Sequence, residues 1–128
     1  TNIWYTSALR YPMRVQLEES IAINVITPSY FLATKFIAFR SRGKSDYFGS
    51  HDFEDMVAVL DGRSSIVNDV SDSPGDVRAF LVTECGSLLA DRSLAEGVSA
   101  NLAPDPASQG RARIILERVR ALAAIVIA

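Results

Sequence analysis

A lysine and two aspartates are the residues of this 128-residue chain whose types and spacing suggest chemistry. Lys35 lies inside an apolar helical stripe, four residues after Phe31 and four before Phe39. An ammonium group in such a stripe needs a carboxylate, a phosphate or a route to water. The next predicted helix carries Asp52 and Asp55, which are three residues apart and therefore share one side of it. The spacing predicts that the three charged groups meet across a pair of helices.

Two interpretations of this meeting are open from the residues alone. In the first, the lysine and the aspartates form a structural ion pair that closes the two helices, and the positive end of the helix dipole also stabilises Asp52. In the second, Lys35 faces the phosphate oxygens of a nucleotide and an aspartate holds it in place. Spacing does not separate them, because both need the same residues at the same positions.

Helix start and stop signals define the two elements that position these groups. A threonine cap followed by proline predicts one helix over residues 27–43, and a serine cap predicts another over residues 50–62. The short connection between them favours packing as antiparallel neighbours. Asp46 and Tyr47 lie in that loop, where they could touch a nucleotide, but solvation is the default expectation for loop residues.

The rest of the chain predicts a hairpin and further helices. Alternating apolar residues indicate antiparallel strands over residues 13–18 and 21–26, after a short helix or turn around residues 4–9. Later helices are expected over residues 64–70, 73–90, 94–102 and from residue 105 onward. The last of them carries a stripe at helical spacing, formed by Ile115, Val119, Leu122 and Val126.

The predicted fold class is therefore α+β and mostly α. Residues 1–27 would form a β-hairpin at the edge of a sheet whose other strands are missing, and residues 28–128 a helical bundle, in one compact unit. An exposed strand edge promotes unwanted pairing with other chains, so we expect something to cover the hairpin.

Two motifs in the charged region resemble those of a known family. The pattern K-x-x-A-x-x-x-R fits Lys35, Ala38 and Arg42. The pattern S-[RH]-D-x-x-D-[LM] fits Ser50, His51, Asp52, Asp55 and Met56. Through these motifs, the segment from Trp4 to Asp69 resembles the AbiEii-like nucleotidyltransferases of abortive-infection and type IV toxin systems, a branch of the polymerase-beta-like nucleotidyltransferases.

The resemblance implies transfer of a nucleoside monophosphate from a magnesium-bound NTP to an acceptor, which in this family can be the end of a tRNA or the partner antitoxin. It implies catalytic roles for Lys35, Asp52 and Asp55. The residues implied in binding the nucleotide or the acceptor are Arg42, Ser50 and His51.

The metal-binding motif of this family is missing from the sequence. The family holds Mg²⁺ through an early Gly-Ser turn followed by a D-x-D pair. Neither Gly49-Ser50 nor Gly86-Ser87 leads into such a pair, so we expect no metal ligands, no cofactor and incomplete catalysis for this chain alone. The chain resembles the C-terminal half of a larger enzyme, whose partner is the missing N-terminal half or a separate chain. The alternative is a non-catalytic interaction module that binds a partner chain through the hairpin edge.

Composition restricts the cellular environment that we expect for the protein, but it does not identify an activity. The net charge of −2 gives no overall attraction to nucleic acid or membrane. A single cysteine, Cys85, excludes an internal disulfide, favours a reducing cytoplasm and is expected in the core. Because His51 is the only histidine, His-based metal sites and a Ser-His-Asp triad have little support. We expect no signal peptide and no membrane span, since arginines closely precede the apolar C-terminal residues.

Overall fold

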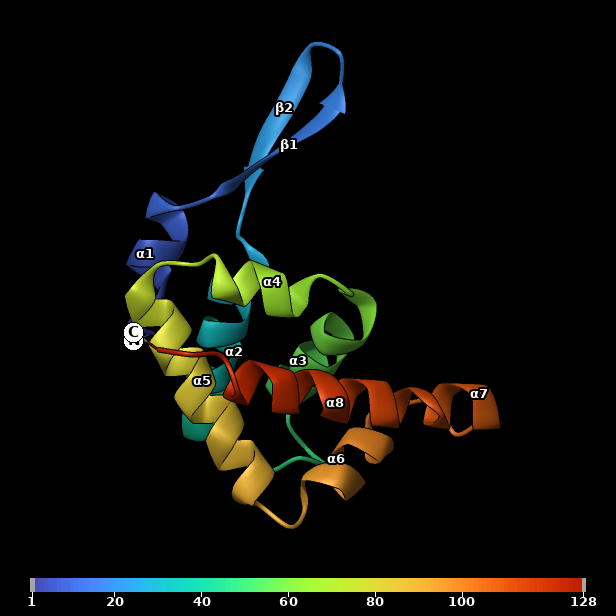
Figure 1. Cartoon of the computed structure of the whole chain (residues 1–128). Helices are drawn as coiled ribbons and strands as arrows, with labels where there is room; N and C mark the ends of the chain where they lie inside the picture. Colours follow the sequence, from blue (N-terminus) through green and yellow to red (C-terminus); the bar gives the residue numbers. More distant parts are fainter. Residues whose placement is uncertain (1, 128) are drawn as a thin grey trace.

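The computed structural model describes residues 2–127, and in it a two-stranded hairpin stands beside a body of helices (Figure 1). The elements in chain order are α1 (Tyr5–Arg10), β1 (Met13–Glu18), β2 (Ile21–Val25), α2 (Pro28–Ser41), α3 (His51–Gly62), α4 (Ile66–Ser71), α5 (Gly75–Ala90), α6 (Leu94–Ala100), α7 (Pro106–Gln109) and α8 (Arg111–Ala123). The structure confirms the predicted fold class, an N-terminal hairpin followed by a mostly helical region. Within residues 2–127, no helix is both long enough and apolar enough to cross a membrane.

The hairpin projects away from the helical body (Figure 1). Its strands pair antiparallel, with Met13 opposite Val25 and Val15 opposite Ile23. Because side chains alternate along a strand, one face is aliphatic along most of its length, although a register shift between Gln16 and Glu18 places Glu18 opposite Ile21 near the turn. The residues of this aliphatic face are Met13, Val15, Leu17, Ile21, Ile23 and Val25. Within residues 2–127 the sheet has only these two strands.

Helices α2 and α3 pack as antiparallel neighbours, as the short loop between them predicts. Near the start of α2, Phe31 lines the same hollow as Val59 from the end of α3. Near the end of α2, the ring of Phe39 lies 5.2 Å from that of Phe53 at the start of α3. Thr27 and Ser50 cap the two helices as expected, each side chain accepting a backbone N–H from the first turn.

Helices α5 and α8 complete the core behind this pair. The predicted stripe of α8 is buried at Ile115, Val119 and Leu122. Cys85 in α5 is also buried, as predicted, and burial raises the pKa of its thiol to about 12. A thiol with so high a pKa stays protonated and unreactive at neutral pH.

Two details of the C-terminal region differ from the prediction. The helix expected from residue 105 onward is broken at Gly110, which separates α7 from α8; glycine is a poor helix former. The stripe also ends early, since α8 stops at Ala123 and Val126 is 83% exposed. The β-branched run of residues 125–127 has low helix propensity, and Val126 has no facing core to compensate.

The loop between α2 and α3 is anchored rather than solvated, which corrects the prediction for Tyr47. Tyr47 is 4% exposed, and its ring lies 5.4 Å from Phe39 and 4.8 Å from Phe53. Its hydroxyl donates to Asp91 at 2.9 Å, while the Asn101 amide donates to its carbonyl at 2.8 Å. The loop is therefore tied to α6 and to the residues before it, which limits how the ends of α2 and α3 can move. Asp46 is exposed as expected.

A pair of glycine variants tests this anchoring. A Cβ added to Gly97 in α6 would lie 2.5 Å from the Cβ of Tyr47, whereas one added to Gly86 in α5 meets nothing within 4 Å. We expect Gly97→Ala to lower the free energy of unfolding by about 1–3 kcal/mol through overpacking. Gly86→Ala should raise it by about 0.5–1 kcal/mol, because alanine is the better helix former. Urea unfolding measures both, and a Gly97→Ala variant as stable as wild type would contradict the anchoring.

Candidate functional site

Lys35, Asp52 and Asp55 converge on the outside of the α2–α3 pair. The Lys35 ammonium lies 2.7 Å from Asp55 Oδ2 and 3.4 Å from Asp52 Oδ1. Lys35 comes from the middle of α2, and both aspartates come from the beginning of α3. Antiparallel packing brings them together, so the predicted meeting of these three groups is observed.

Arg42, at the C-terminal end of α2, holds the same aspartate from a second side. Its Nε donates to Asp52 Oδ2 at 2.8 Å and its Nη2 donates to Oδ1 at 2.7 Å. This forked geometry is the strongest form of an arginine–carboxylate pair. The Asp52 side chain is 5% exposed, whereas that of Arg42 is 71% exposed, so the other N–H donors of the guanidinium remain open to solvent. Lys35, Arg42, Asp52 and Asp55 are called the ionic cluster below.

The charges of the ionic cluster balance, since it holds two cations and two carboxylates. Hydrogen bonds from Arg42 lower the pKa of Asp52, and the hydrogen bond to Asp55 raises the pKa of Lys35. Both shifts favour the charged forms of Asp52 and Lys35 at neutral pH. The Lys35 ammonium also lies 5.3 Å from the centre of the Phe31 ring, which adds a cation–π contact.

Ser50 and His51 both lie beside the ionic cluster, but Ser50 is hydrogen-bonded within the fold whereas His51 faces solvent. Ser50 Oγ accepts the backbone N–H of Phe53 at 3.2 Å and so serves as the N-cap of α3. Gly43 packs tightly on this cap, because a Cβ there would lie 2.7 Å from Ser50 Oγ. The His51 side chain is 96% exposed, with Nδ1 3.4 Å from the carboxylate of Glu54. A hollow of about 280 Å³ is lined by Arg42, Gly43, Gly49, Ser50, His51 and Asp52.

The residues of the ionic cluster do not fit a magnesium ion. Mg²⁺ requires an octahedral shell of oxygen ligands. Both oxygens of Asp52 already accept hydrogen bonds from cations, and Asp55 Oδ2 is paired with Lys35. A metal would have to displace two positive charges that already neutralise these carboxylates. Over residues 2–127, no group of three or more His, Cys, Asp or Glu side chains is arranged to hold a metal ion.

Comparisons of the chain with protein-family models, with curated proteins and with solved structures found no match. The assignment of a function therefore depends on the geometry of the ionic cluster and on the motifs that converge there.

Two arginines of α8 hold the C-terminal end of α3, and the sequence analysis did not predict these contacts. Arg118 of α8 donates from Nη1 to the carbonyls of Leu60 at 2.6 Å and Asp61 at 2.7 Å. Arg111 pairs with the Asp61 carboxylate at 2.7 Å. These guanidinium groups satisfy carbonyls that a helix leaves free at its C-terminus. The only signal was two arginines seven residues apart, which would share one face of a predicted helix.

The pH dependence of stability should report the pairing of Asp52 with Arg42. Because its pKa is lowered in the folded protein, its charged form adds stability above about pH 3.9, the pKa of an unfolded aspartate. That stability is lost as the pH falls through the lower folded-state pKa. We expect Asp52→Asn to cost about 1–3 kcal/mol at pH 7 and much less at pH 2. Chemical unfolding between these pH values gives both numbers.

The control for this experiment is Glu117→Gln, which removes an exposed pair with Arg113 at 3.6 Å. It should change stability by at most about 0.5 kcal/mol at any pH. A wild-type advantage over Asp52→Asn that stayed constant from pH 7 to pH 2 would contradict the assigned charge state.

Magnesium binding provides a second check on the ionic cluster. Because its carboxylates already neutralise Lys35 and Arg42, we expect the chain alone to show a Kd for Mg²⁺ of about 1 mM or weaker. Isothermal titration calorimetry in low salt without nucleotide measures this directly. Micromolar binding that Asp52→Asn abolishes would show that the cations give way to the metal.

Proposed function

We propose that this chain is the helical half of a nucleotidyltransferase-like protein that moves a nucleoside monophosphate from an NTP to a tRNA or protein acceptor in a toxin–antitoxin or phage-defence setting. The observation that carries the proposal is the convergence of the motif residues, because Lys35, Arg42, Asp52 and Asp55 form one partly exposed cluster. In this proposal the carboxylates that hold magnesium lie in another segment or chain.

The geometry suggests how the cluster would treat an anionic substrate. Asp52 is nearly buried and holds both cations in place, whereas the Asp55 side chain is 47% exposed. An ion pair with an exposed carboxylate is worth little net free energy. A phosphate group would therefore displace Asp55 from Lys35 more readily than Asp52. The solvent-facing donors of Arg42, at the rim of the adjoining hollow, would bind a further oxygen.

A second candidate, of a different class, is a non-catalytic module that binds a partner chain. It is favoured by the exposed apolar side chains of the hairpin and by the free edges of its two strands, because the sheet has no third strand within residues 2–127. In this alternative the ionic cluster serves only to fix α2 against α3. The two candidates differ in what removal of the Lys35 charge should do.

We predict that Lys35→Met abolishes transfer while leaving the fold intact. In the complete protein, with its metal-binding half present, loss of this charge should reduce labelled NMP transfer by at least about a hundredfold. The melting temperature should shift by no more than a few degrees, because the lost pair with the half-exposed Asp55 is worth little and Arg42 still neutralises Asp52 after the longer Lys35 contact is lost. Lys44→Met is the matched control, since Lys44 is an exposed lysine in the adjoining loop and belongs to no ion pair within residues 2–127. Full transfer by Lys35→Met would leave Lys35 with a structural role only.

A further inference from the structure

A hollow of about 310 Å³ lies between α1 and the second half of α2, and it is called the Tyr5 hollow below. Arg42 is the only charged residue among those that line it. The same arginine lines the hollow beside Ser50, so its guanidinium joins the Tyr5 hollow to the ionic cluster. The residues that line the Tyr5 hollow are Asn2, Tyr5, Ile37, Ala38, Ser41 and Arg42.

Arg42 brings an oriented and accessible cation to the Tyr5 hollow. Its forked pair with the 5% exposed Asp52 fixes the plane of the guanidinium, but it occupies only one Nε–H and one Nη2–H. The remaining donors are open to solvent, because the side chain is 71% exposed. A planar guanidinium that is held in place from behind is well suited to bind phosphate oxygens.

Tyr5 brings an exposed aromatic ring on a fixed support. Its neighbour Trp4 is buried and packs on Phe80, with ring centres 5.1 Å apart, whereas the Tyr5 ring is 56% exposed. The amide of Asn2 donates to the carbonyl of Thr34 at 2.7 Å, which holds the start of α1 against α2. An exposed ring on a fixed backbone can stack with a planar ligand at little cost in conformational entropy.

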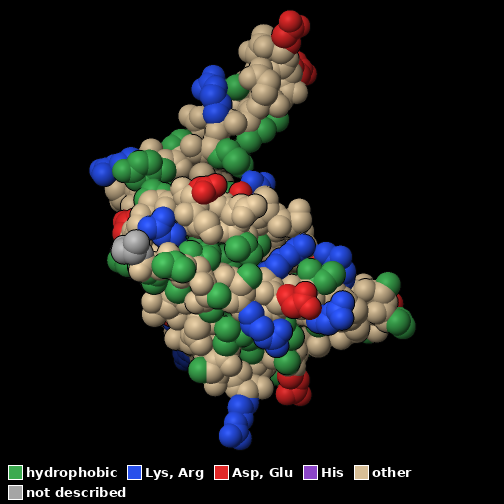
Figure 2. All heavy atoms as spheres, viewed as in Figure 1, with side chains coloured by type: hydrophobic (Ala, Val, Ile, Leu, Met, Phe, Trp, Pro, Cys, Tyr) green, Lys and Arg blue, Asp and Glu red, His purple; other side chains and the backbone are tan. Residues whose placement is uncertain are grey.

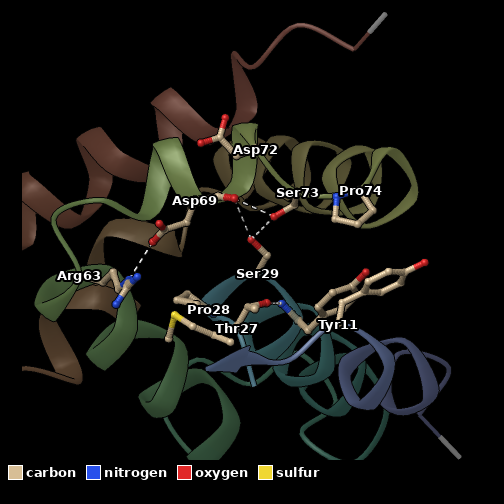
Figure 3. A pocket seen from close by; sticks show the side chains of 11 residues that line it. Tyr11, Thr27, Pro28, Ser29, Arg63, Asp69, Asp72, Ser73 and Pro74 are labelled. Atoms are coloured by element: carbon tan, nitrogen blue, oxygen red, sulfur yellow. Dashed lines mark hydrogen bonds and ion pairs between the residues drawn. The ribbon is translucent and has the colours of Figure 1, made fainter. Parts of the chain in front are cut away.

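A second exposed tyrosine borders a hollow of the opposite character (Figure 3). The Tyr11 ring is 48% exposed, but carboxylates of Asp69 and Asp72 line the same hollow. The arginine of that hollow, Arg63, is already paired with Asp69 at 2.8 Å. These carboxylates would repel an anion, whereas no acidic residue lines the Tyr5 hollow. The Tyr5 hollow is therefore the better fit for a ligand with a planar ring and a negative charge.

The distribution of charge favours a small ligand over a long nucleic acid. On the face that Figure 2 shows, Lys and Arg side chains lie among Asp and Glu side chains and form no continuous basic stripe. The net charge of the chain is −2. A long nucleic acid is bound through many phosphate contacts along a basic surface. One guanidinium beside one exposed ring matches a single nucleotide instead.

We propose that the Tyr5 hollow binds one nucleotide, with its base stacked on the Tyr5 ring and a phosphate on the open donors of Arg42. Ile37, which lines the hollow from α2, would supply apolar contact for the base. This inference rests on the proposed transfer function, because it names the residue that positions the base of the nucleotide beside the ionic cluster.

NMR titration of the full chain with AMP, ribose 5-phosphate and adenosine tests the proposal. We expect AMP to bind about tenfold more tightly than either of the other two, because only AMP carries both a base and a phosphate. Tyr5→Ala should lower the affinity for AMP to that for ribose 5-phosphate, whereas Tyr5→Phe should preserve it. Phe48→Ala is the matched control, since Phe48 is 59% exposed but lines neither hollow beside Arg42. Circular dichroism of each variant verifies the fold.

Each failure has a distinct meaning. Equal binding of AMP and ribose 5-phosphate, or an unchanged affinity for AMP in Tyr5→Ala, would overturn the role of Tyr5. An affinity for AMP no higher than that for adenosine would overturn the role of Arg42. An adenylate trinucleotide that bound more than about tenfold more tightly than AMP would identify a longer strand as the occupant and overturn the single nucleotide.

The complete protein separates this inference from the proposed function. Transfer of labelled NMP that Tyr5→Ala leaves unchanged would overturn the inference, while the proposed function would stand. Base-dependent binding of AMP by a complete protein that shows no transfer to any acceptor would overturn the proposed function and leave the Tyr5 hollow as a nucleotide site.

Discussion

A nearly buried carboxylate at the start of α3 is the constraint on which the arrangement of α2 and α3 depends. A charge removed from water must be neutralised and hydrogen-bonded, or the group would lose its charge. Asp52 meets this requirement with Lys35 and Arg42, which are seven residues apart and therefore lie on one face of α2. That face must lie against the first turn of α3, so the carboxylate sets both the orientation and the register of the pair.

Contacts at both ends of α3 and in the loop between α2 and α3 keep the two helices in this register. At one end of α3, Ser50 caps the helix and Gly43 allows the loop to pass close to the cap. At the other end, guanidinium groups of α8 bind the last carbonyls of α3. Between α2 and α3, Tyr47 ties the loop to α6. These contacts fix both ends of α3 and the loop that leads into it, and a preorganised charged site depends on such support.

Local patterns predicted most of this fold, and long-range contacts account for what they missed. Caps and apolar spacing placed α2, α3 and α5 within a few residues, because those signals depend on neighbours in the sequence. The meeting of Lys35 with Asp52 and Asp55 was also predictable, since a short loop leaves two helices few ways to pack. The burial of Tyr47 was not, because Asp91 and Asn101, which hold it, are 44 and 54 residues away. The forked Arg42–Asp52 pair was missed because a cation at a helix C-terminus has a sufficient local explanation in the helix dipole.

The buried thiol of Cys85 has a practical consequence. It is the only cysteine of the chain, it is 1% exposed, and burial raises its pKa to about 12. Maleimide reagents attack the accessible thiolate, so the native residue will be almost silent toward them while the protein is folded. A cysteine introduced at the turn of the projecting hairpin would therefore be labelled alone, without first replacing Cys85. The wild-type background already provides a single-site scaffold for attaching a spectroscopic reporter to the arm.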